Sequence, residues 1–256
     1  MRLAGLILLL SAALSAAQEV ALKADRVAHV LVLKEVYLNG QGPFHMMVDT
    51  GAGSCLIRPA VAKRLGLRPV YTVERVTVTG VKPVPTAILD DVRVGPVVDQ
   101  GVEVMMTDVE LRDVDGVLGQ SWLARHDYLL DYRGRRLVLD GSEPARGVRE
   151  PLRSSNGTPQ IVAEVDGHRQ DLVVDSGAPI LILVRRSPRV SPATLVTNAG
   201  SVEARTGSAR ITIGGTYARL MPTIEVNTSP TPGLLPAAAF ASVYISNRDG
   251  VVVLVP

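Results

Sequence analysis

Short apolar runs separated by turn residues cover most of the chain. Residues 27–38 form one such run, and Asn39-Gly40 after it is typical of a tight hairpin turn that leads into a second run at residues 44–48. Val is abundant, and 23 Gly and 17 Pro interrupt the 256 residues often. This pattern favours strands and turns over long helices. We therefore expect an all-β fold.

Two segments depart from the strand pattern and predict short helices. Residues 58–66 have Pro59 near their start and Gly66 at their end, which is the usual placement of these residues around a helix. Residues 120–125 predict the second helix. Strands are expected on both sides of each, including a hairpin over residues 128–139.

Two apolar runs end in the same short motif. The run at residues 44–48 is followed by Asp49-Thr50-Gly51-Ala52, and the run at residues 172–174 by Asp175-Ser176-Gly177-Ala178. A carboxylate beside a buried strand is costly unless it is hydrogen-bonded, paired or used. One such motif is more often a turn with a local hydrogen bond. Two copies in one chain favour a shared role.

Further landmarks repeat in the same order and indicate an internal duplication. Gly116-Val117-Leu118 in the first half corresponds to Gly233-Leu234-Leu235 in the second, and the hairpin that begins at Tyr128 corresponds to one at Tyr244. Residues 140–159 are rich in charge, Pro, Gly and Ser. We place the boundary there, with an N-terminal lobe at 18–150 and a C-terminal lobe at 151–256.

The N-terminus predicts export. A basic start, an apolar stretch at residues 3–14 and small residues at 15–17 form a signal peptide pattern, cut before Gln18. The apolar stretch is short for a membrane span, and no later stretch is long enough. We expect an exported protein, periplasmic or secreted, without a stable membrane span.

The net charge and the residue composition limit the kinds of partner that the chain is expected to bind. The formal net charge is +2 and aromatic residues make up 4% of the chain, which argues against nucleic-acid binding. The single cysteine, Cys55, lies in an apolar run and is expected in the core. His29, His45, His126 and His168 show no metal-ligand spacing. We expect no metal and no cofactor.

The two aspartates are candidates for paired acid–base catalysis. If two related halves pack about a pseudo-twofold axis, Asp49 and Asp175 meet across it. When two carboxyl groups lie this close together, ionising both costs free energy because the charges repel, so one keeps a proton while the other stays charged. Such a pair can take a proton from a water molecule and donate one to a carbonyl oxygen.

The two Asp motifs, together with Gly116-Val117-Leu118-Gly119, resemble those of the retropepsin/pepsin family of aspartic proteases. The Ala after each Gly is similar to the retroviral type, and the duplication within one chain is similar to pepsin. The resemblance implies a bilobal all-β fold with a substrate cleft between the lobes and a hairpin flap over it. It implies an endopeptidase that acts on peptides or proteins, and because both halves lie in one chain, a monomer suffices.

The resemblance also implies roles for the neighbouring residues. Thr50 and Ser176 would hydrogen-bond across the lobe interface, while Gly51 and Gly177 would let the two loops approach. Ala52 and Ala178 are expected to contact substrate. Tyr71 is expected to do the same from the flap, which the sequence places at residues 71–87.

One position departs from the family pattern. In the family, each Asp loop is braced by two apolar residues and a Gly that start a short helix. The first half has Val117-Leu118-Gly119, but the second has Leu234-Leu235-Pro236. Pro is acceptable at the start of a helix, which residues 237–240 would continue.

Two alternative functions belong to other classes of protein. Gly119-Gln120-Ser121 lacks the second glycine of a serine hydrolase nucleophile elbow, so Ser121 is a weak candidate nucleophile. The serious alternative is a catalytically silent, pepsin-like peptide-binding module, because fold does not fix function.

Overall fold

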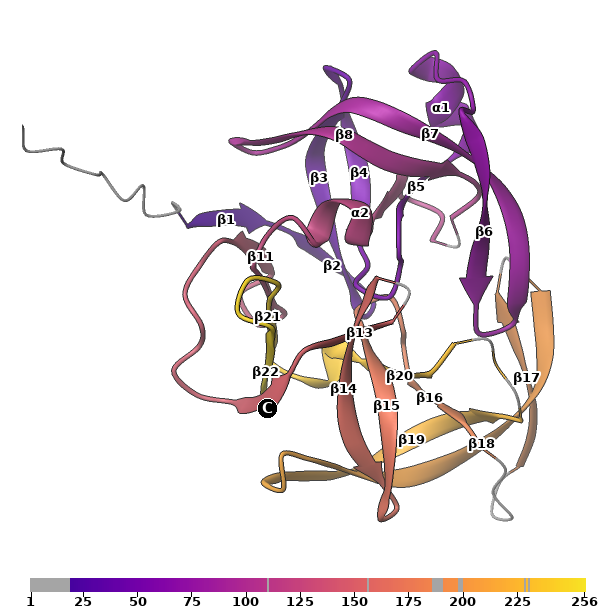
Figure 1. Ribbon diagram of the computed structural model, residues 1–256, viewed down its shortest axis with the longest axis vertical. Coiled ribbons are helices and arrows are strands. Elements are labelled where there is room, and N and C mark those ends of the chain that lie inside the picture. The colour runs from indigo at the N-terminus through magenta and orange to yellow at the C-terminus, as the bar shows by residue number, and fades with distance from the viewer. Residues whose placement is uncertain are drawn as a thin grey trace, which may run out of the picture.

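The computed structural model describes residues 19–109, 111–155, 157–185, 191–197, 200–227, 229 and 231–256. In Figure 1 these residues form two strand-rich lobes, one above the other, beside a third sheet. The all-β fold with few short helices is therefore confirmed. The leader expected at residues 1–17 lies outside the described residues.

An eight-stranded sheet forms the first lobe, in the order β2-β3-β4-β9-β5-β8-β7-β6. Helices α1 (Pro59–Arg64) and α2 (Gln120–Leu123) follow β5 and β9. The strands are β2 (Asp25–Val27), β3 (Val30–Leu38), β4 (Gln41–Val48), β5 (Cys55–Ile57), β6 (Tyr71–Thr77), β7 (Gly80–Val94), β8 (Val97–Met106) and β9 (Gly116–Leu118).

The second lobe repeats this topology strand for strand, in the order β13-β14-β15-β20-β16-β19-β18-β17. A short 3-10 turn, η1 (Ala237–Ala239), takes the place of α2. The strands are β13 (Arg153–Ser155), β14 (Thr158–Val165), β15 (His168–Asp175), β16 (Leu181–Val184), β17 (Ser191–Thr197), β18 (Gly200–Ile213), β19 (Tyr217–Val226) and β20 (Gly233–Pro236).

A six-stranded antiparallel sheet joins the two halves. Its order is β1-β11-β10-β21-β22-β12, and β10 pairs with β21 so that Leu129 lies opposite Tyr244. Residue 150, where the sequence places the lobe boundary, lies within β12. The strands are β1 (Val20–Lys23), β10 (Tyr128–Asp131), β11 (Arg136–Leu139), β12 (Val148–Pro151), β21 (Ser242–Ser246) and β22 (Val251–Val255).

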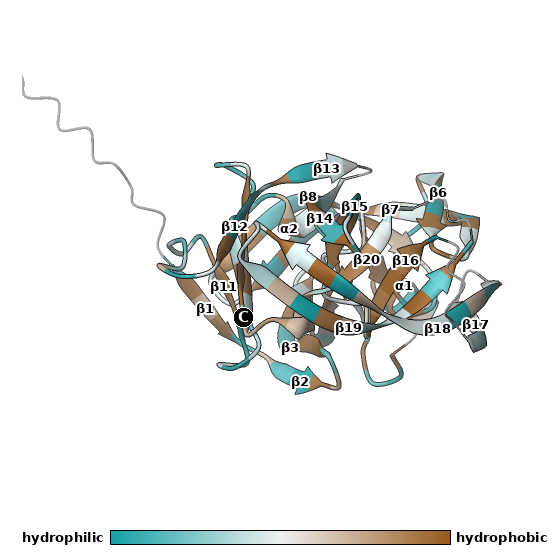
Figure 2. Cartoon of the chain, turned by 90° about the horizontal axis from the view of Figure 1, so that it is seen from below, coloured by the Kyte–Doolittle hydropathy of each residue, from teal (hydrophilic) through white to brown (hydrophobic). Residues whose placement is uncertain are grey.

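One hydrophobic core runs through all three sheets. Leu31, Leu172 and Val252, one from each sheet, belong to the same buried cluster as Trp122 of α2. Figure 2 shows hydrophobic colour on inner strands such as β16 and β20, and hydrophilic colour on the short outer strands β2 and β13. Because the lobes share a core, their relative position is fixed by apolar burial as well as by the joining sheet.

Several boundaries differ from the sequence prediction. The strand expected at residues 27–38 is interrupted at Ala28, which has a left-handed φ of 54°, because the chain reverses there to pair Val27 with Val30. The helices expected at residues 58–66 and 120–125 are shorter. The helix expected after Pro236 is a single 3-10 turn.

Candidate active site

The two aspartates lie at corresponding strand ends. Asp49 directly follows β4, and Asp175 is the last residue of β15. Each strand pairs in parallel with a short strand of the same lobe, β9 beside β4 and β20 beside β15. The repeated topology therefore sends both motif loops out of equivalent positions, and the structure brings them together between the lobes.

The two loops contact each other through their glycines. A Cβ atom on Gly51 would lie 2.4 Å from the carboxyl carbon of Asp175, and one on Gly177 would lie 2.7 Å from that of Asp49. Real Cβ contacts are never that short. Each glycine therefore provides the space that the aspartate of the other lobe occupies, and this close approach explains why both motifs need Gly.

Two buried hydroxyl groups connect the loops across the interface. The Thr50 hydroxyl donates to the Val174 carbonyl (2.6 Å) and accepts from the Ser176 amide (2.9 Å). The Ser176 hydroxyl does the same in reverse, donating to the Val48 carbonyl and accepting from the Thr50 amide, both at 2.9 Å. This reciprocal set satisfies four backbone groups and fixes the relative position of the two aspartates.

Backbone amides orient both carboxyl groups. Asp49 Oδ1 accepts from the Gly51 amide at 2.9 Å, whereas Asp175 Oδ1 accepts from the amides of Gly177 (2.7 Å) and Ala178 (3.0 Å). The remaining side of each carboxyl faces its counterpart, and the two share a side-chain hydrogen bond. Such an arrangement requires a proton between them.

Burial and mutual repulsion make that proton stable. Burial raises the pKa of Asp49, although the hydrogen bond from Asp175 opposes this effect. Burial also raises the pKa of Asp175, and the charge of Asp49 raises it further, to well above the usual value for Asp. The pair titrates as a unit, and the direction of these shifts favours a proton on Asp175 donated to an ionised Asp49.

A cleft of about 550 Å³ contains the two aspartates and is lined by both lobes. Ala52 and Ala178, expected to contact substrate, both lie in its wall. Tyr71 is not among the described residues that line it. The Tyr71 hydroxyl instead donates to Glu103 Oε2 (2.6 Å), while Glu103 Oε1 accepts from Ser54, a cleft residue beside the Asp49 loop.

Two hairpins close the cleft. The first flap is the β6–β7 hairpin, and the second flap is the β17–β18 hairpin, which meets it at the right of Figure 1. Val78, between β6 and β7, is 7% exposed and packs against second-lobe residues that include Ile182 and Val226. The sequence predicted only the first flap.

The elements that brace the two Asp loops differ between the lobes. In the first lobe a Cβ on Gly119 would lie 2.3 Å from the Ser54 carbonyl, so only Gly fits. The Gln120 amide donates to the Ala52 carbonyl (2.8 Å) and its side chain to the Thr50 carbonyl (2.9 Å). In the second lobe buried Pro236 pairs in register with Asp175. Pro236, which stands where the family pattern has Gly, therefore fits at the end of β20.

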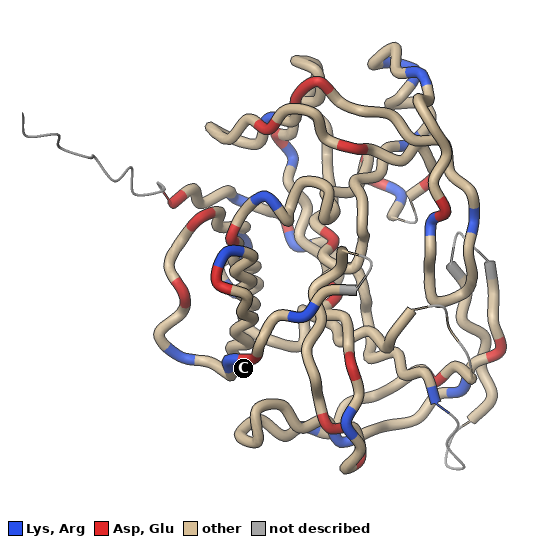
Figure 3. The backbone as a smooth tube through the Cα atoms, viewed as in Figure 1, with Lys and Arg blue, Asp and Glu red and all other residues tan. Residues whose placement is uncertain are grey.

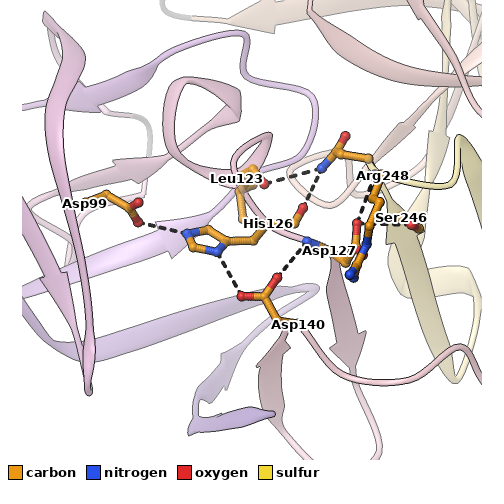
Figure 4. A network of polar contacts seen from close by, with 8 residues as sticks. Asp99, Leu123, His126, Asp127, Asp140, Ser246 and Arg248 are labelled. Carbon is orange, nitrogen blue, oxygen red and sulfur yellow. Dashed lines mark hydrogen bonds and ion pairs between the residues drawn. The ribbon is translucent and has the colours of Figure 1, made fainter. Parts of the chain in front are cut away.

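A polar network below the cleft connects the two halves of the chain. In Figure 4, His126 lies between Asp99 (2.8 Å from Nε2) and Asp140 (3.2 Å from Nδ1), and the neighbouring Asp127 accepts from Arg248 and Ser246. Burial pushes the pKa of Asp127 up, but hydrogen bonds from Arg248 and Ser246 outweigh it and hold that pKa below its usual value.

The structure does not place the other candidate groups in a second active site among the described residues. The Ser121 hydroxyl donates to the Glu103 carbonyl (2.7 Å) and accepts from the Cys55 amide (2.9 Å), which is a structural role. Cys55 is buried. No group of three or more His, Cys, Asp or Glu among the described residues is arranged to hold a metal ion. In the same part of the chain, no helix has the length and apolar character to span a bilayer.

A duplicated all-β fold that brings two Asp-(Thr/Ser)-Gly loops together at one cleft defines an aspartic-protease-like protein. Residues 34–122 match the family model described as aspartyl protease. This part of the first lobe, which contains the Asp49 loop, the first flap and β9, is therefore similar to aspartyl proteases. No curated protein matches the chain.

Proposed function

We propose that the chain is an aspartic endopeptidase in which Asp49 and Asp175 share one proton and activate a water molecule. The observation that carries this proposal is the mutual packing of the two motif loops. Each glycine makes room for the opposite carboxyl, and the carboxyls are hydrogen-bonded to each other. Such a pair is expensive to bury, and chemistry that needs both protonation states at once gives it a use.

The reaction follows from the proton's position. Ionised Asp49 takes a proton from the water as its oxygen attacks the peptide carbonyl carbon. Protonated Asp175 donates its proton to the carbonyl oxygen as the tetrahedral intermediate forms. Asp49 then gives its proton to the departing amine nitrogen and the C–N bond breaks, while one hydroxyl of the intermediate returns its proton to Asp175, so that the pair again holds one proton. General acid and base steps of this kind contribute about 10²–10⁴-fold each.

The rest of the molecule supports a peptide substrate. Residues of both lobes line the cleft around the two aspartates, and its volume of about 550 Å³ offers room for several residues of a peptide. Both aspartates come from one chain, and we propose that a monomer is active. The leader pattern at residues 1–17 supports export to the periplasm or beyond.

The test is cleavage of a mixed peptide library by the chain from residue 18 onward, from acid to neutral pH. The Asp175→Asn variant keeps an oxygen for the Gly177 and Ala178 amides but cannot serve as the acid. Asp171→Asn, an exposed substitution on the same strand, is the matched control. We expect cleavage by wild type and by the control but not by Asp175→Asn. Peptide binding by a folded wild type without cleavage at any pH would instead support the silent binding module.

A further inference from the structure

One side chain of the first lobe binds the Asp175 loop of the second lobe. His29 lies in the two-residue turn between β2 and β3, is half-buried and lines the cleft. Its Nε2 lies 2.9 Å from the Gly177 carbonyl oxygen. A carbonyl oxygen can only accept a hydrogen bond, so Nε2 carries the hydrogen and donates it. In Figure 1, β2 runs toward the second lobe, which places its turn at the interface.

Gly177 is held by two first-lobe side chains. A Cβ atom on this residue would lie 2.7 Å from the carboxyl carbon of Asp49, so Asp49 packs against its Cα atom. His29 binds the carbonyl group of the same residue. The position of this part of the second-lobe loop therefore depends on the first lobe, in addition to the hydroxyl exchange described above.

The hydrogen bond from His29 continues to the catalytic carboxyl through a single peptide group. The Gly177 carbonyl and the Ala178 amide belong to the same peptide group, and that amide donates to Asp175 Oδ1 at 3.0 Å. A hydrogen bond accepted at a peptide oxygen polarises the group and strengthens the donor at its nitrogen. His29 is therefore connected to the orientation of Asp175 by two hydrogen bonds in series.

The second lobe offers no side chain in the place of His29. The β13–β14 hairpin has the same strand pairing around its turn as the β2–β3 hairpin, so Gly157 stands at the position that corresponds to His29. Gly157 has no side chain that could donate a hydrogen bond. The Asp175 loop thus has a support from the opposite lobe that the Asp49 loop cannot receive from the corresponding position.

We propose that His29 is a positioning residue that acts on the Asp175 carboxyl through the peptide group between Gly177 and Ala178. The contact keeps Oδ1 of that carboxyl on its own loop, so that the other side stays turned toward Asp49, as donation of the shared proton requires. Nε2 carries a hydrogen in the imidazolium and in one of the two neutral forms of the ring, so the contact does not require a charged His29. The inference rests on the proposed function for its kinetic test only.

The first experiment measures steady-state kinetics with several peptides that wild type cleaves. His29→Phe keeps a ring but removes the donor, whereas His29→Gln offers an amide nitrogen in place of Nε2. We expect His29→Phe to lower kcat about 10-fold with little change in KM, because a displacement of about 1 Å at a catalytic group costs about 10²-fold and a smaller one costs less. The loss should be the same for peptides of different sequence, and His29→Gln should recover most of it.

The matched control is His168→Phe. His168 is exposed and begins β15, the strand that ends at Asp175, so it lies at the end of that strand away from the cleft. Figure 3 shows charged positions around this hairpin turn, at the bottom of the view. We expect the control to keep the wild-type kcat and KM.

The second experiment needs no activity. Hydrogen exchange of the ¹⁵N-labelled chain from residue 18 onward, followed by NMR, reports on the Ala178 amide, and the amides of β22 serve as the reference for global unfolding. We expect the Ala178 amide to exchange about 10-fold faster in His29→Phe while β22 stays unchanged, because one hydrogen bond of the series is lost. His29→Gln should restore slow exchange.

The two experiments separate the inference from the proposed function. If wild type cleaves peptides but exchange at Ala178 is unchanged in His29→Phe, the inference is wrong while the proposed function stands. A loss of kcat that depends on the peptide sequence, or that His29→Gln does not recover, also overturns the inference, because it indicates substrate contact or packing. If no peptide is cleaved but exchange changes as expected, the proposed function fails and the inference about the loop stands.

Discussion

In the first lobe, Gln120 donates two hydrogen bonds to the Asp49 loop, and Gly119 occupies a place with no room for a Cβ atom. In the second lobe, Pro236 stands at the corresponding position and a 3-10 turn replaces the helix. Asp175 accepts two backbone amides of its own loop, whereas Asp49 accepts one. The support of the two loops thus differs between the lobes.

What the lobes share is the contact between them. The glycine packing and the exchange of hydroxyl hydrogen bonds are reciprocal, with nearly equal distances in both directions. The comparison indicates that the geometry of the pair depends on the interface, while the surroundings of each loop are free to differ. It also separates two features of the fold: the interface fixes the relative position of the two acids, whereas the residues that line the cleft differ between the lobes.

Substitution of the two motif glycines should give the largest loss of activity. It also tests whether the two lobes are equivalent at their interface. Gly51→Ala and Gly177→Ala each place a Cβ atom within 2.7 Å of the opposite carboxyl carbon, so the loops must separate. A displacement of about 1 Å at a catalytic group costs about 10²-fold. We expect each variant to lose at least that much in kcat/KM. A large loss in one and near-normal activity in the other would break the equivalence.

The hydroxyl exchange should produce the next largest effect, on stability. Thr50→Val and Ser176→Ala each leave a buried carbonyl and a buried amide without a partner, at about 1–3 kcal/mol for each group. Thr50→Ser keeps the hydroxyl and is the matched control. Urea unfolding should show a similar loss in the free energy of unfolding for Thr50→Val and Ser176→Ala, and a small loss for the control. In the double variant the two losses should not add, because the hydroxyl groups act on the same two loops.

Two buried aspartates should respond to pH in opposite ways. Asp175 has a raised pKa, so the protein loses stability as pH rises from the usual pKa of Asp to the raised one, and Asp175→Asn should stabilise the protein at pH 7 but not near pH 3. The pKa of Asp127 is lowered by Arg248 and Ser246 despite its burial, so its contribution to stability is present at neutral pH and lost as pH falls. Asp127→Asn should therefore destabilise the protein, by about 1–3 kcal/mol at pH 7 and less in acid.

Thermal unfolding of wild type, Asp175→Asn and Asp127→Asn between pH 3 and pH 7 tests both predictions. Wild type supplies the reference at each pH. If both substitutions changed stability with pH in the same direction, the electrostatic environments of Asp175 and of Asp127 in the network of Figure 4 would not be opposite, which would contradict the account.

The first flap should give the smallest effect. Val78 is buried among second-lobe residues, so Val78→Ser weakens the closed flap by about 1–2 kcal/mol of lost apolar burial. We expect KM to rise several-fold with a smaller change in kcat, as measured by steady-state kinetics. Val98→Ser, at an exposed position of β8, is the control. An unchanged KM would show that Val78 does not hold the flap over substrate.

Much of the fold follows from local sequence pattern. The run before Asp49, the Asn39-Gly40 turn and the helix after Pro59 lie where their residues predict them, because each depends on near neighbours. The repeated motifs also predicted that Asp49 and Asp175 would meet, since two copies of one topology place the same loop at equivalent points.

Contacts between distant segments were not predictable in the same way. Nothing local to Val78 shows that it packs into the other lobe, and nothing near Leu129 shows that β10 pairs with β21. The second flap did leave a signal. Residues 193–196 alternate in burial within β17, and applying the repeat to the first flap would have pointed to them. Tyr71 drew attention as an aromatic residue, whereas the first-flap residues that line the cleft are residues 74–78.

The most direct test of the account is the pH dependence of kcat/KM for wild type, Asp49→Asn and Asp175→Asn, measured with one peptide that wild type cleaves. The account predicts a bell-shaped profile for wild type, because activity needs one proton on the pair. It predicts no cleavage by either variant at any pH, with cooperative unfolding retained in both. Wild-type activity in either variant would contradict the shared-proton pair and with it the proposed mechanism.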